Sequence, residues 1–190
     1  MKKLALTDFA KYRYPSALEL SPDGRYLTFA LKDVDREGDG YRWNLWLYDL
    51  ERRESRQITQ GDDQRKAVWE DNTHILYKTT EPDEALRARG FEEEWTVYHR
   101  LNVCTGEDRE AFRLPMSVSG LWKMDEGRYV FTGETHLDRP NLLELTGEAL
   151  EKELVRRQQT RGYKVLTELP LCENGVGMFN QTRNTLFLYC

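Results

Sequence analysis

Short apolar segments, each preceded by a tight polar turn, recur along the whole chain. The clearest copy is Ser-Pro-Asp-Gly at 21–24, which is followed by the apolar segment 26–30. Glycine and asparagine adopt positive φ angles most readily, and β-branched and aromatic residues favour strands. The pattern therefore predicts a turn followed by a strand in each copy. The four copies pair turn 21–24 with strand 26–30, 71–72 with 74–78, 126–127 with 128–132, and 183–184 with 185–189.

The spacing of these copies is that of a repeat protein. Turn residues Gly24, Asn72, Gly127 and Asn184 are 48, 55 and 57 residues apart, close to the roughly 40–50 residues of a four-stranded propeller blade. We therefore predict an all-β fold, a partial β-propeller of about three to four four-stranded antiparallel blades with short helical insertions. Further strands are expected at 44–50 and 56–59 in the first interval, 96–103 and 110–114 in the second, and 141–145 and 163–167 in the third.

The last strand of each blade is expected just before the next turn, at 66–69 and 119–122, and each of these segments ends in a tryptophan. Trp69 and Trp122 are predicted to pack between blades rather than to form a ligand platform, because large aromatic side chains dominate core contacts. The expected blade modules are 17–69, 70–122 and 123–182, with the next module starting at 183–190.

The chain is interpreted as a single, truncated propeller domain spanning residues 1–190. Propellers have about 4–8 blades, and the repeat accounts for about three and a half of them. The apolar strand at 185–190 either closes a ring by pairing with 16–20 or lies at an exposed edge. An exposed apolar edge strand predicts self-association.

Two segments depart from the strand pattern, and both are predicted to be short surface helices inserted in blade loops. Residues 81–90 have acidic residues and a proline at the start, arginines near the end and a final glycine, as helix ends prefer. Residues 148–159 place Leu150 and Leu154 four positions apart among charged residues, which is typical of an amphipathic surface helix.

Composition argues against several classes of protein. Hydrophobic residues make up 39% and charged residues 32%, and the mean hydropathy of -0.76 leaves no membrane-spanning run. A net charge of -5, mixed in sign along the chain, gives no support for nucleic-acid binding. The first ten residues lack the apolar core of a secretory signal, which predicts a cytoplasmic protein. Cys104, Cys172 and Cys190 have neither disulfide nor zinc spacing, so no metal and no cofactor are expected.

Three segments together resemble the propeller repeat of the prolyl oligopeptidase family of serine peptidases. They are the turn 21–24 with its strand, the segment 44–50 and the ending Gln57-Ile58-Thr59. The similarity is greatest to the branch of acylaminoacyl peptidases and dipeptidyl peptidases, which the segment 168–179 also resembles. The Ser-Pro-Asp-Gly turn alone also occurs in unrelated propellers, so it identifies the architecture better than the activity.

The resemblance implies a propeller placed ahead of an α/β-hydrolase domain that supplies a Ser-Asp-His triad and hydrolyses peptide or acyl-amino-acid bonds. The propeller would gate the access of peptide substrates to that domain. Such a domain carries its nucleophile in a G-x-S-x-G turn, and no serine here has this context. We therefore expect no catalytic residue in this chain and interpret His74, His99 and His136 as strand residues. The alternative is a stand-alone propeller that binds a protein or carbohydrate partner.

One acidic run is a candidate substrate-binding site. Glu92-Glu93-Glu94-Trp95 follows the predicted helix 81–90, and some propeller-capped dipeptidyl peptidases hold a substrate's N-terminal ammonium with paired glutamates. The resemblance implies that Glu92 and Glu93 would supply such charge-assisted hydrogen bonds. The simpler interpretation is a solvated acidic segment that leads into a strand. The acidic, glycine-containing segment 35–40 lacks the alternation of an EF-hand and is expected to be a loop between strands.

Overall fold

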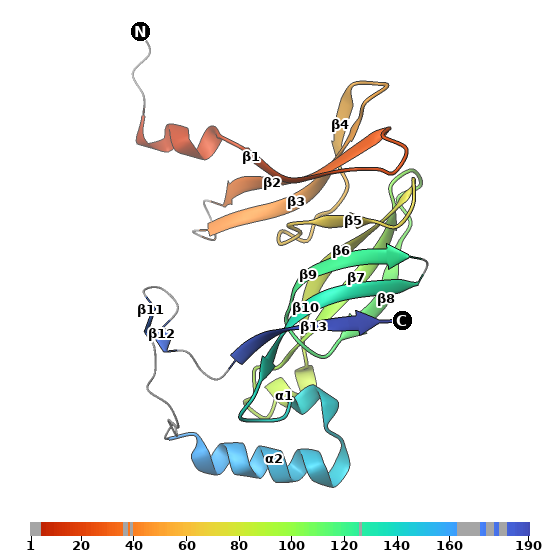
Figure 1. The fold of residues 1–190 in the computed structure, drawn as a ribbon. Coiled ribbons are helices and arrows are strands. Elements are labelled where there is room, and N and C mark those ends of the chain that lie inside the picture. Colours follow the sequence, from red (N-terminus) through yellow and green to blue (C-terminus); the bar gives the residue numbers. More distant parts are fainter. Residues whose placement is uncertain are drawn as a thin grey trace. The chain divides into compact units, whose positions relative to one another are not determined.

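Figure 1 shows a computed structural model of the chain. The structure describes residues 5–35, 38, 40–125, 127–162, 172–173, 177–178 and 182–190. The chain divides into two compact units. The first unit comprises Met1–Thr80 and Val97–Arg113, and the second comprises Glu81–Thr96 and Leu114–Cys190.

The first sheet is an antiparallel meander that follows the 3-10 helix η1 (Leu6–Lys11). Its strands, in order, are β1 (Tyr14–Leu20), β2 (Tyr26–Asp35), β3 (Gly40–Asp49) and β4 (Glu54–Gln57). The turn between β1 and β2 is held by Ser21, whose Oγ donates to Asp23 Oδ1 over 2.6 Å and accepts from the Tyr26 amide over 2.9 Å. Gly24 has a φ of 74° in this turn, a conformation that glycine adopts without steric cost.

The second sheet repeats this arrangement with β5 (Ala67–Trp69), β6 (His74–Pro82), β7 (Glu94–Asn102) and β8 (Asp108–Leu114). Asp71 holds the turn between β5 and β6, because its Oδ1 accepts from the amides of Thr73 (2.7 Å) and His74 (2.8 Å). Burial of Asp71 opposes its ionisation, but these hydrogen bonds prevail and lower the pKa of Asp71 to about 2. The same position in both sheets is therefore fixed by a side chain that satisfies the turn backbone.

The first unit has an apolar core to which both sheets contribute. Strand side chains alternate between the two faces of a sheet, and Ala30 of β2 and Leu45 and Leu47 of β3 enter this core. Trp69 belongs to the core, stacks on Tyr26 with 6.5 Å between ring centroids, and donates from Nε1 to the Glu19 carbonyl over 3.1 Å. The predicted packing role of Trp69 between blades is confirmed. The buried members are Ala30, Leu45, Leu47, Ala67, Trp69, Ile75, Tyr77, Leu101 and Val103.

The third sheet lies in the second unit. It consists of β9 (Val118–Asp125), β10 (Arg128–His136) and β13 (Thr182–Tyr189), in the antiparallel order β13-β10-β9. Phe131 of β10 and Phe187 of β13 stack with 5.0 Å between ring centroids. Two further two-residue strands, β11 (Cys172–Glu173) and β12 (Gly177–Met178), pair with each other.

Both predicted helices are present as insertions between strands, but the first is shorter than predicted, because residues 81–82 belong to β6 and only 84–87 are helical. The helix α1 (Glu84–Arg87) lies between β6 and β7, and the 3-10 helix η2 (Leu142–Glu144) and α2 (Gly147–Thr160) lie between β10 and β13 (Figure 1). The two insertions pack on each other through the buried Leu86, Leu142 and Leu154. The helical insertions therefore form a small apolar cluster of their own, which the sequence did not predict.

The predicted all-β, partial β-propeller architecture is confirmed. Consecutive antiparallel sheets follow one another along the chain, two of them with four strands and the third with three strands among the described residues. The predicted module boundaries are wrong by one strand, however. Residues 67–69 pair with β6 and 118–125 with β10, so each of these segments opens a blade instead of closing one. The recurrent turn therefore joins the first two strands of a blade, because a tight turn suits a hairpin.

The structure also contradicts the predictions for the turn 183–184, for the strand 141–145 and for Trp122. Arg183 and Asn184 do not form a turn that opens a new module. They lie inside β13, opposite Thr135 and Glu134 of β10. Residues 141–145 are not a strand, because Asn141 Oδ1 accepts from the Leu143 amide over 3.0 Å and begins η2.

Trp122 is not packed between blades: 49% of it is exposed. The adjacent Leu121 is buried, so Trp122 faces the opposite side of β9, over Gly120. The expectations for Glu126 of the third turn, for strand 163–167, for most of the segment 168–179 and for residues 36, 37 and 39 lie outside the described residues.

Candidate functional site

Asp83 stabilises the connection between β6 and β7 by hydrogen bonds to both of its ends. This residue caps α1, because its Oδ1 accepts from the Leu86 amide over 2.9 Å, and its Oδ2 accepts from Trp95 Nε1 over 3.2 Å. The Asp83 amide also donates to the Glu93 carbonyl over 2.9 Å. The hydrogen bond from Leu86 is the main cause of the lowered pKa of Asp83. One ionised side chain thus ties together the start of the helix and the start of the strand.

The acidic segment, residues 92–94, leaves this connection and enters β7. Gly90 has a φ of 84° and redirects the chain after α1. Glu92 is exposed, the Glu93 side chain is 24% exposed, and Glu94 is the first residue of β7. The predicted order of helix, acidic run and strand is therefore confirmed.

Arg157 of α2 binds the acidic segment. Its Nη1 donates to Glu93 Oε1 over 2.6 Å, its Nε donates to Glu153 Oε1 over 2.9 Å, and its Nη2 donates to the Pro140 carbonyl over 2.6 Å. The Arg157 side chain is only 11% exposed, so these charge-assisted bonds lie in a partly desolvated setting where they are strong. Glu93 is consequently fixed to the helix.

Glu153 is the second acid of this network. Arg156 donates to it from Nε and Nη2, both over 2.7 Å. These bonds, followed by those of Arg157, lower the pKa of Glu153 to about 2. Glu153 is therefore ionised at neutral pH although it is buried.

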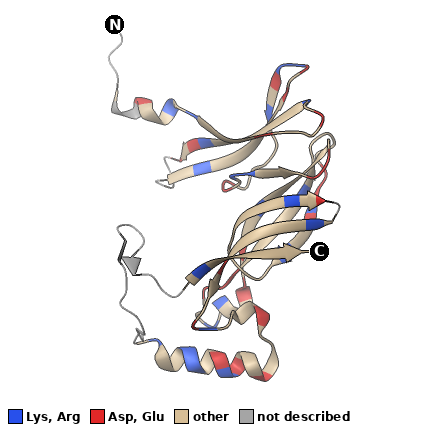
Figure 2. Ribbon diagram, in the orientation of Figure 1, with Lys and Arg blue, Asp and Glu red and all other residues tan. Residues whose placement is uncertain are grey.

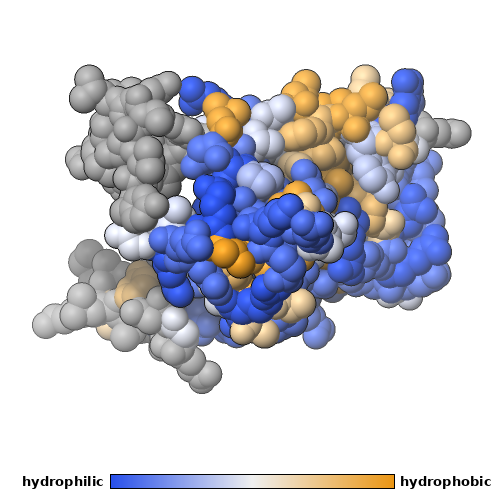
Figure 3. Space-filling model, turned by 90° about the horizontal axis from the view of Figure 1, so that it is seen from below, coloured by the Kyte–Doolittle hydropathy of each residue, from blue (hydrophilic) through white to orange (hydrophobic). Residues whose placement is uncertain are grey.

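A second ion pair joins the two insertions. Arg89, beyond α1, donates to Glu151 of α2 through both terminal nitrogens, over 2.8 Å and 2.9 Å. Figure 2 shows the alternating charges along α2, and Figure 3 shows that the face carrying α2 is largely hydrophilic. Together with the cluster around Leu86 and Leu154, these contacts make the insertions one structural element that presents the acidic segment.

The structure separates the roles of the two predicted site residues. Glu93 is already paired with a guanidinium, whereas Glu92 is exposed and its side chain makes no hydrogen bond or ion pair with any described residue. Sequence reasoning identified both glutamates but missed Arg157. The residue lies in a charged helix 64 positions away from Glu93, so no local pattern could have identified it.

His136, at the end of β10, stands near this network. Burial lowers the pKa of His136, and the charge of Arg139 adds to this effect, while Glu134, Asp138 and Glu93 oppose it. Arg139 Nη2 lies 3.3 Å from His136 Nε2. The imidazole is therefore mostly neutral at pH 7, so it brings no positive charge that would pair with the acidic segment.

The other histidines are strand residues, as predicted. His74 opens β6 and lies 2.9 Å from Asp71 Oδ2, and His99 of β7 lies 3.2 Å from Asp108 Oδ1. Within the described residues, no group of three or more His, Cys, Asp or Glu is placed to hold a metal ion. Of the helices that the structure describes, none combines the length and the apolar character that a membrane span requires.

Comparisons with known proteins concern the fold. No protein-family model and no curated protein matches the sequence. Acylaminoacyl peptidase from Pyrococcus horikoshii aligns with 95% of this chain at a TM-score of 0.61 and 13% identity. An acylaminoacyl peptidase in complex with Z-Gly-Gly-Phe-chloromethyl ketone aligns with 96% at 0.62 and 11% identity, and AtxE2 isopeptidase aligns with 93% at 0.55 and 14% identity.

The alignments cover only part of those proteins. This chain spans 24% of each acylaminoacyl peptidase chain and 28% of the isopeptidase chain. At such low identities the likeness shows that the fold is shared. Activity, substrates and partners do not follow from it.

Proposed function

We propose that this chain is the non-catalytic propeller portion of a serine peptidase of the prolyl oligopeptidase family. In this proposal it gates the access of short or unfolded peptides to an α/β-hydrolase domain encoded outside these residues, which hydrolyses peptide or acyl-amino-acid bonds. The observation that supports it most is the fold shared with an acylaminoacyl peptidase over 95% of the chain. A cytoplasmic location and self-association through the edge strand β13, where Leu186 and Leu188 are exposed, stay predictions.

The gene sequence beyond Cys190 tests this proposal. We expect a G-x-S-x-G motif followed by an aspartate and a histidine, which is the chain order of the triad in α/β-hydrolases. An open reading frame that adds only further blades would contradict the peptidase assignment. It would favour a stand-alone propeller that binds a protein or carbohydrate partner.

Within this proposal, Glu92 and Glu93 serve the free amino terminus of the substrate in different ways. Glu92 is exposed and available, so its carboxylate accepts hydrogen bonds from the ammonium. Glu93 uses Oε1 for Arg157, which leaves Oε2 for the ammonium and fixes the direction of the segment. The site would then bind the charge that a free amino terminus carries at neutral pH.

Kinetics of the full gene product with Glu92→Gln test this assignment. Hydrogen bonds to a charged group contribute about 1.5–3 kcal/mol, so KM for substrates with a free amino terminus should rise about 10-fold or more with kcat unchanged. The same substrates with an acetylated amino terminus should show no change. Glu84→Gln, which alters another exposed acid of the same insertion, is the matched control. An unchanged KM for free-amino substrates would remove Glu92 from the site.

A further inference from the structure

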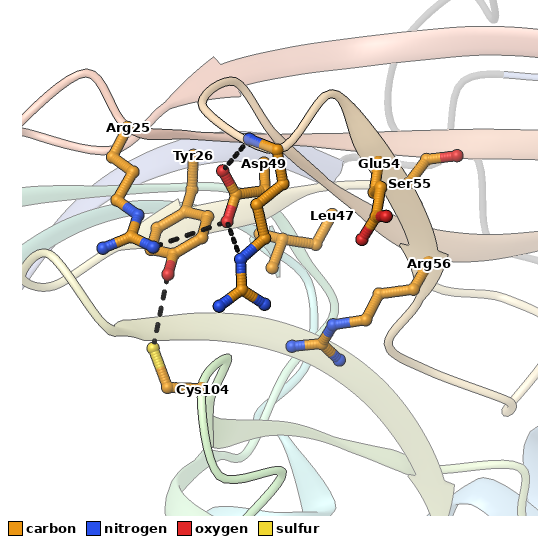
Figure 4. A pocket seen from close by; sticks show the side chains of 9 residues that line it. Arg25, Tyr26, Leu47, Asp49, Glu54, Ser55, Arg56 and Cys104 are labelled. Atoms are coloured by element: carbon orange, nitrogen blue, oxygen red, sulfur yellow. Dashed lines mark hydrogen bonds and ion pairs between the residues drawn. The ribbon is translucent and has the colours of Figure 1, made fainter.

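A pocket of about 380 Å³ lies in the first unit, at the turn ends of the first two sheets (Figure 4). Its volume is within the roughly 300–1,000 Å³ of sites that bind small molecules. The first sheet supplies most of the lining, and Cys104 comes from the turn between β7 and β8. The lining residues are Arg25, Tyr26, Leu47, Asp49, Arg52, Glu54, Ser55, Arg56 and Cys104.

Three guanidinium groups line this pocket. Arg25 precedes β2, Arg52 lies in the turn between β3 and β4, and Arg56 lies in β4. Figure 4 shows the guanidinium groups of Arg25 and Arg56 on the side that faces Cys104. The hairpin geometry of the first sheet thus brings Arg25 close to Arg52 and Arg56, which lie 27 and 31 positions later in the sequence.

None of these guanidinium groups makes a bidentate hydrogen-bonded ion pair with one of the described carboxylates. Arg25 is paired with two acids, because its Nη2 lies 3.5 Å from Asp49 Oδ2 and its buried Nε lies 3.5 Å from Glu51 Oε2 without forming a hydrogen bond. Arg52 Nε is 4.0 Å from Asp49 Oδ2, and its side chain is 72% exposed. Arg56 donates through Nη2 to the Val103 carbonyl, which carries no net charge. Arg52 and Arg56 therefore keep donors that a ligand can use, whereas Arg25 is held by Asp49 and Glu51.

The two acids of the lining cancel only part of this charge. Asp49 Oδ1 accepts from the amides of Glu51 and Arg52, over 2.9 Å and 3.0 Å, and the bond from Arg52 is the main cause of its lowered pKa. Asp49 therefore holds the turn between β3 and β4 through Oδ1, while its Oδ2 lies 3.5 Å from Arg25 and 4.0 Å from Arg52. Glu54 is the other lining acid, so the lining carries three positive and two negative side chains.

We propose that this pocket binds a small organic anion with two or three carboxylate or phosphate groups. Arg52 and Arg56 are its principal ligands, because guanidinium groups bind such oxyanions with paired hydrogen bonds. The hydroxyl group of Tyr26 supplies a further donor from the wall. This site does not depend on the proposed peptidase activity, and it lies in a different unit from Glu92.

Protection of Cys104 from alkylation tests the proposal on the full 190-residue chain. Cys104 lines the pocket, and both Cys104 and Cys190 are exposed free thiols. Iodoacetamide is uncharged, so its reaction at each cysteine can be followed by peptide mass spectrometry with Cys190 as internal reference. Citrate at about ten times its Kd leaves roughly a tenth of the pockets open, and should therefore slow Cys104 about tenfold. Sodium chloride at matched ionic strength should have no effect.

Two substitutions give the matched comparison. Arg52→Gln removes a lining cation that is mostly exposed, so the fold is retained, and should abolish protection. Arg53→Gln removes the neighbouring cation, which is not in the lining, and should keep protection. Inorganic phosphate and an acetylated, amidated Glu-Asp-Glu peptide distinguish free anions from carboxylates carried on a peptide. Equal slowing of Cys190, protection that survives Arg52→Gln, or no slowing by any of the three probes would overturn the proposal.

Discussion

Arg157→Met removes the guanidinium that joins the acidic segment to α2 and keeps a long unbranched side chain. The lost bonds run to Glu93, Glu153 and the Pro140 carbonyl. Removing one partner of a buried ion pair costs about 3–5 kcal/mol because the other charge is left without a partner. Glu153 keeps Arg156, and Glu93 is partly exposed, so we expect the free energy of unfolding to fall by about 2–3 kcal/mol.

Arg156→Met is the matched control for this substitution. Its side chain is 50% exposed and Glu153 would keep Arg157, so the expected loss is below about 1 kcal/mol. Urea unfolding followed by tryptophan fluorescence measures both losses, and hydrogen exchange of the α2 amides assigns them to the second unit. A loss for Arg157→Met no larger than that for Arg156→Met would refute the role of Arg157 as the anchor of the acidic segment.

Acid stability and turn geometry give two further predictions. The pKa of Glu153 is lowered from 4.5 to about 2, mainly by Arg156. A pKa lowered by folding contributes stability that is fully present above pH 4.5 and is lost as the pH falls toward about 2. Glu153→Gln should therefore flatten the fall of Tm across this window, and a curve parallel to that of the native protein would contradict it. Gly24→Ala meets no atom within 4 Å, so its cost of about 1–2 kcal/mol in urea unfolding comes from the positive φ alone. Gly162→Ala, also without neighbours within 4 Å but without a positive φ, should be neutral, and equal losses would disprove the argument.

The sequence predicted the hairpin turns and the central strands because their signals are local. Ser21 donates to Asp23 within the turn that contains Gly24, and Asp71 accepts from the nearby amides of Thr73 and His74. The predicted module boundaries were wrong because the first strand of each blade has only a weak signal in the sequence. The strand β1 is mostly exposed and contains Ala17 with a φ of 50°, and β5 has only three residues.

The candidate site was predicted only in part, because only its local features leave a signal in the sequence. The acidic segment is visible as three consecutive glutamates, and α1 and α2 are visible from their caps and charges. The bonds Arg157–Glu93 and Arg89–Glu151 join residues 64 and 62 positions apart, and such pairing depends on tertiary packing. The arginine-lined pocket is likewise assembled from separate strands and a turn of the next sheet.

Labelling with a fluorophosphonate probe, which reacts with activated serine nucleophiles, tests the central claim most directly. We expect the full gene product to be labelled at a single serine beyond Cys190, and the 190-residue chain to stay unlabelled under the same conditions. An unlabelled full product, or a label that maps to one of the serines within residues 1–190, would contradict the assignment of this chain as the propeller of a serine peptidase.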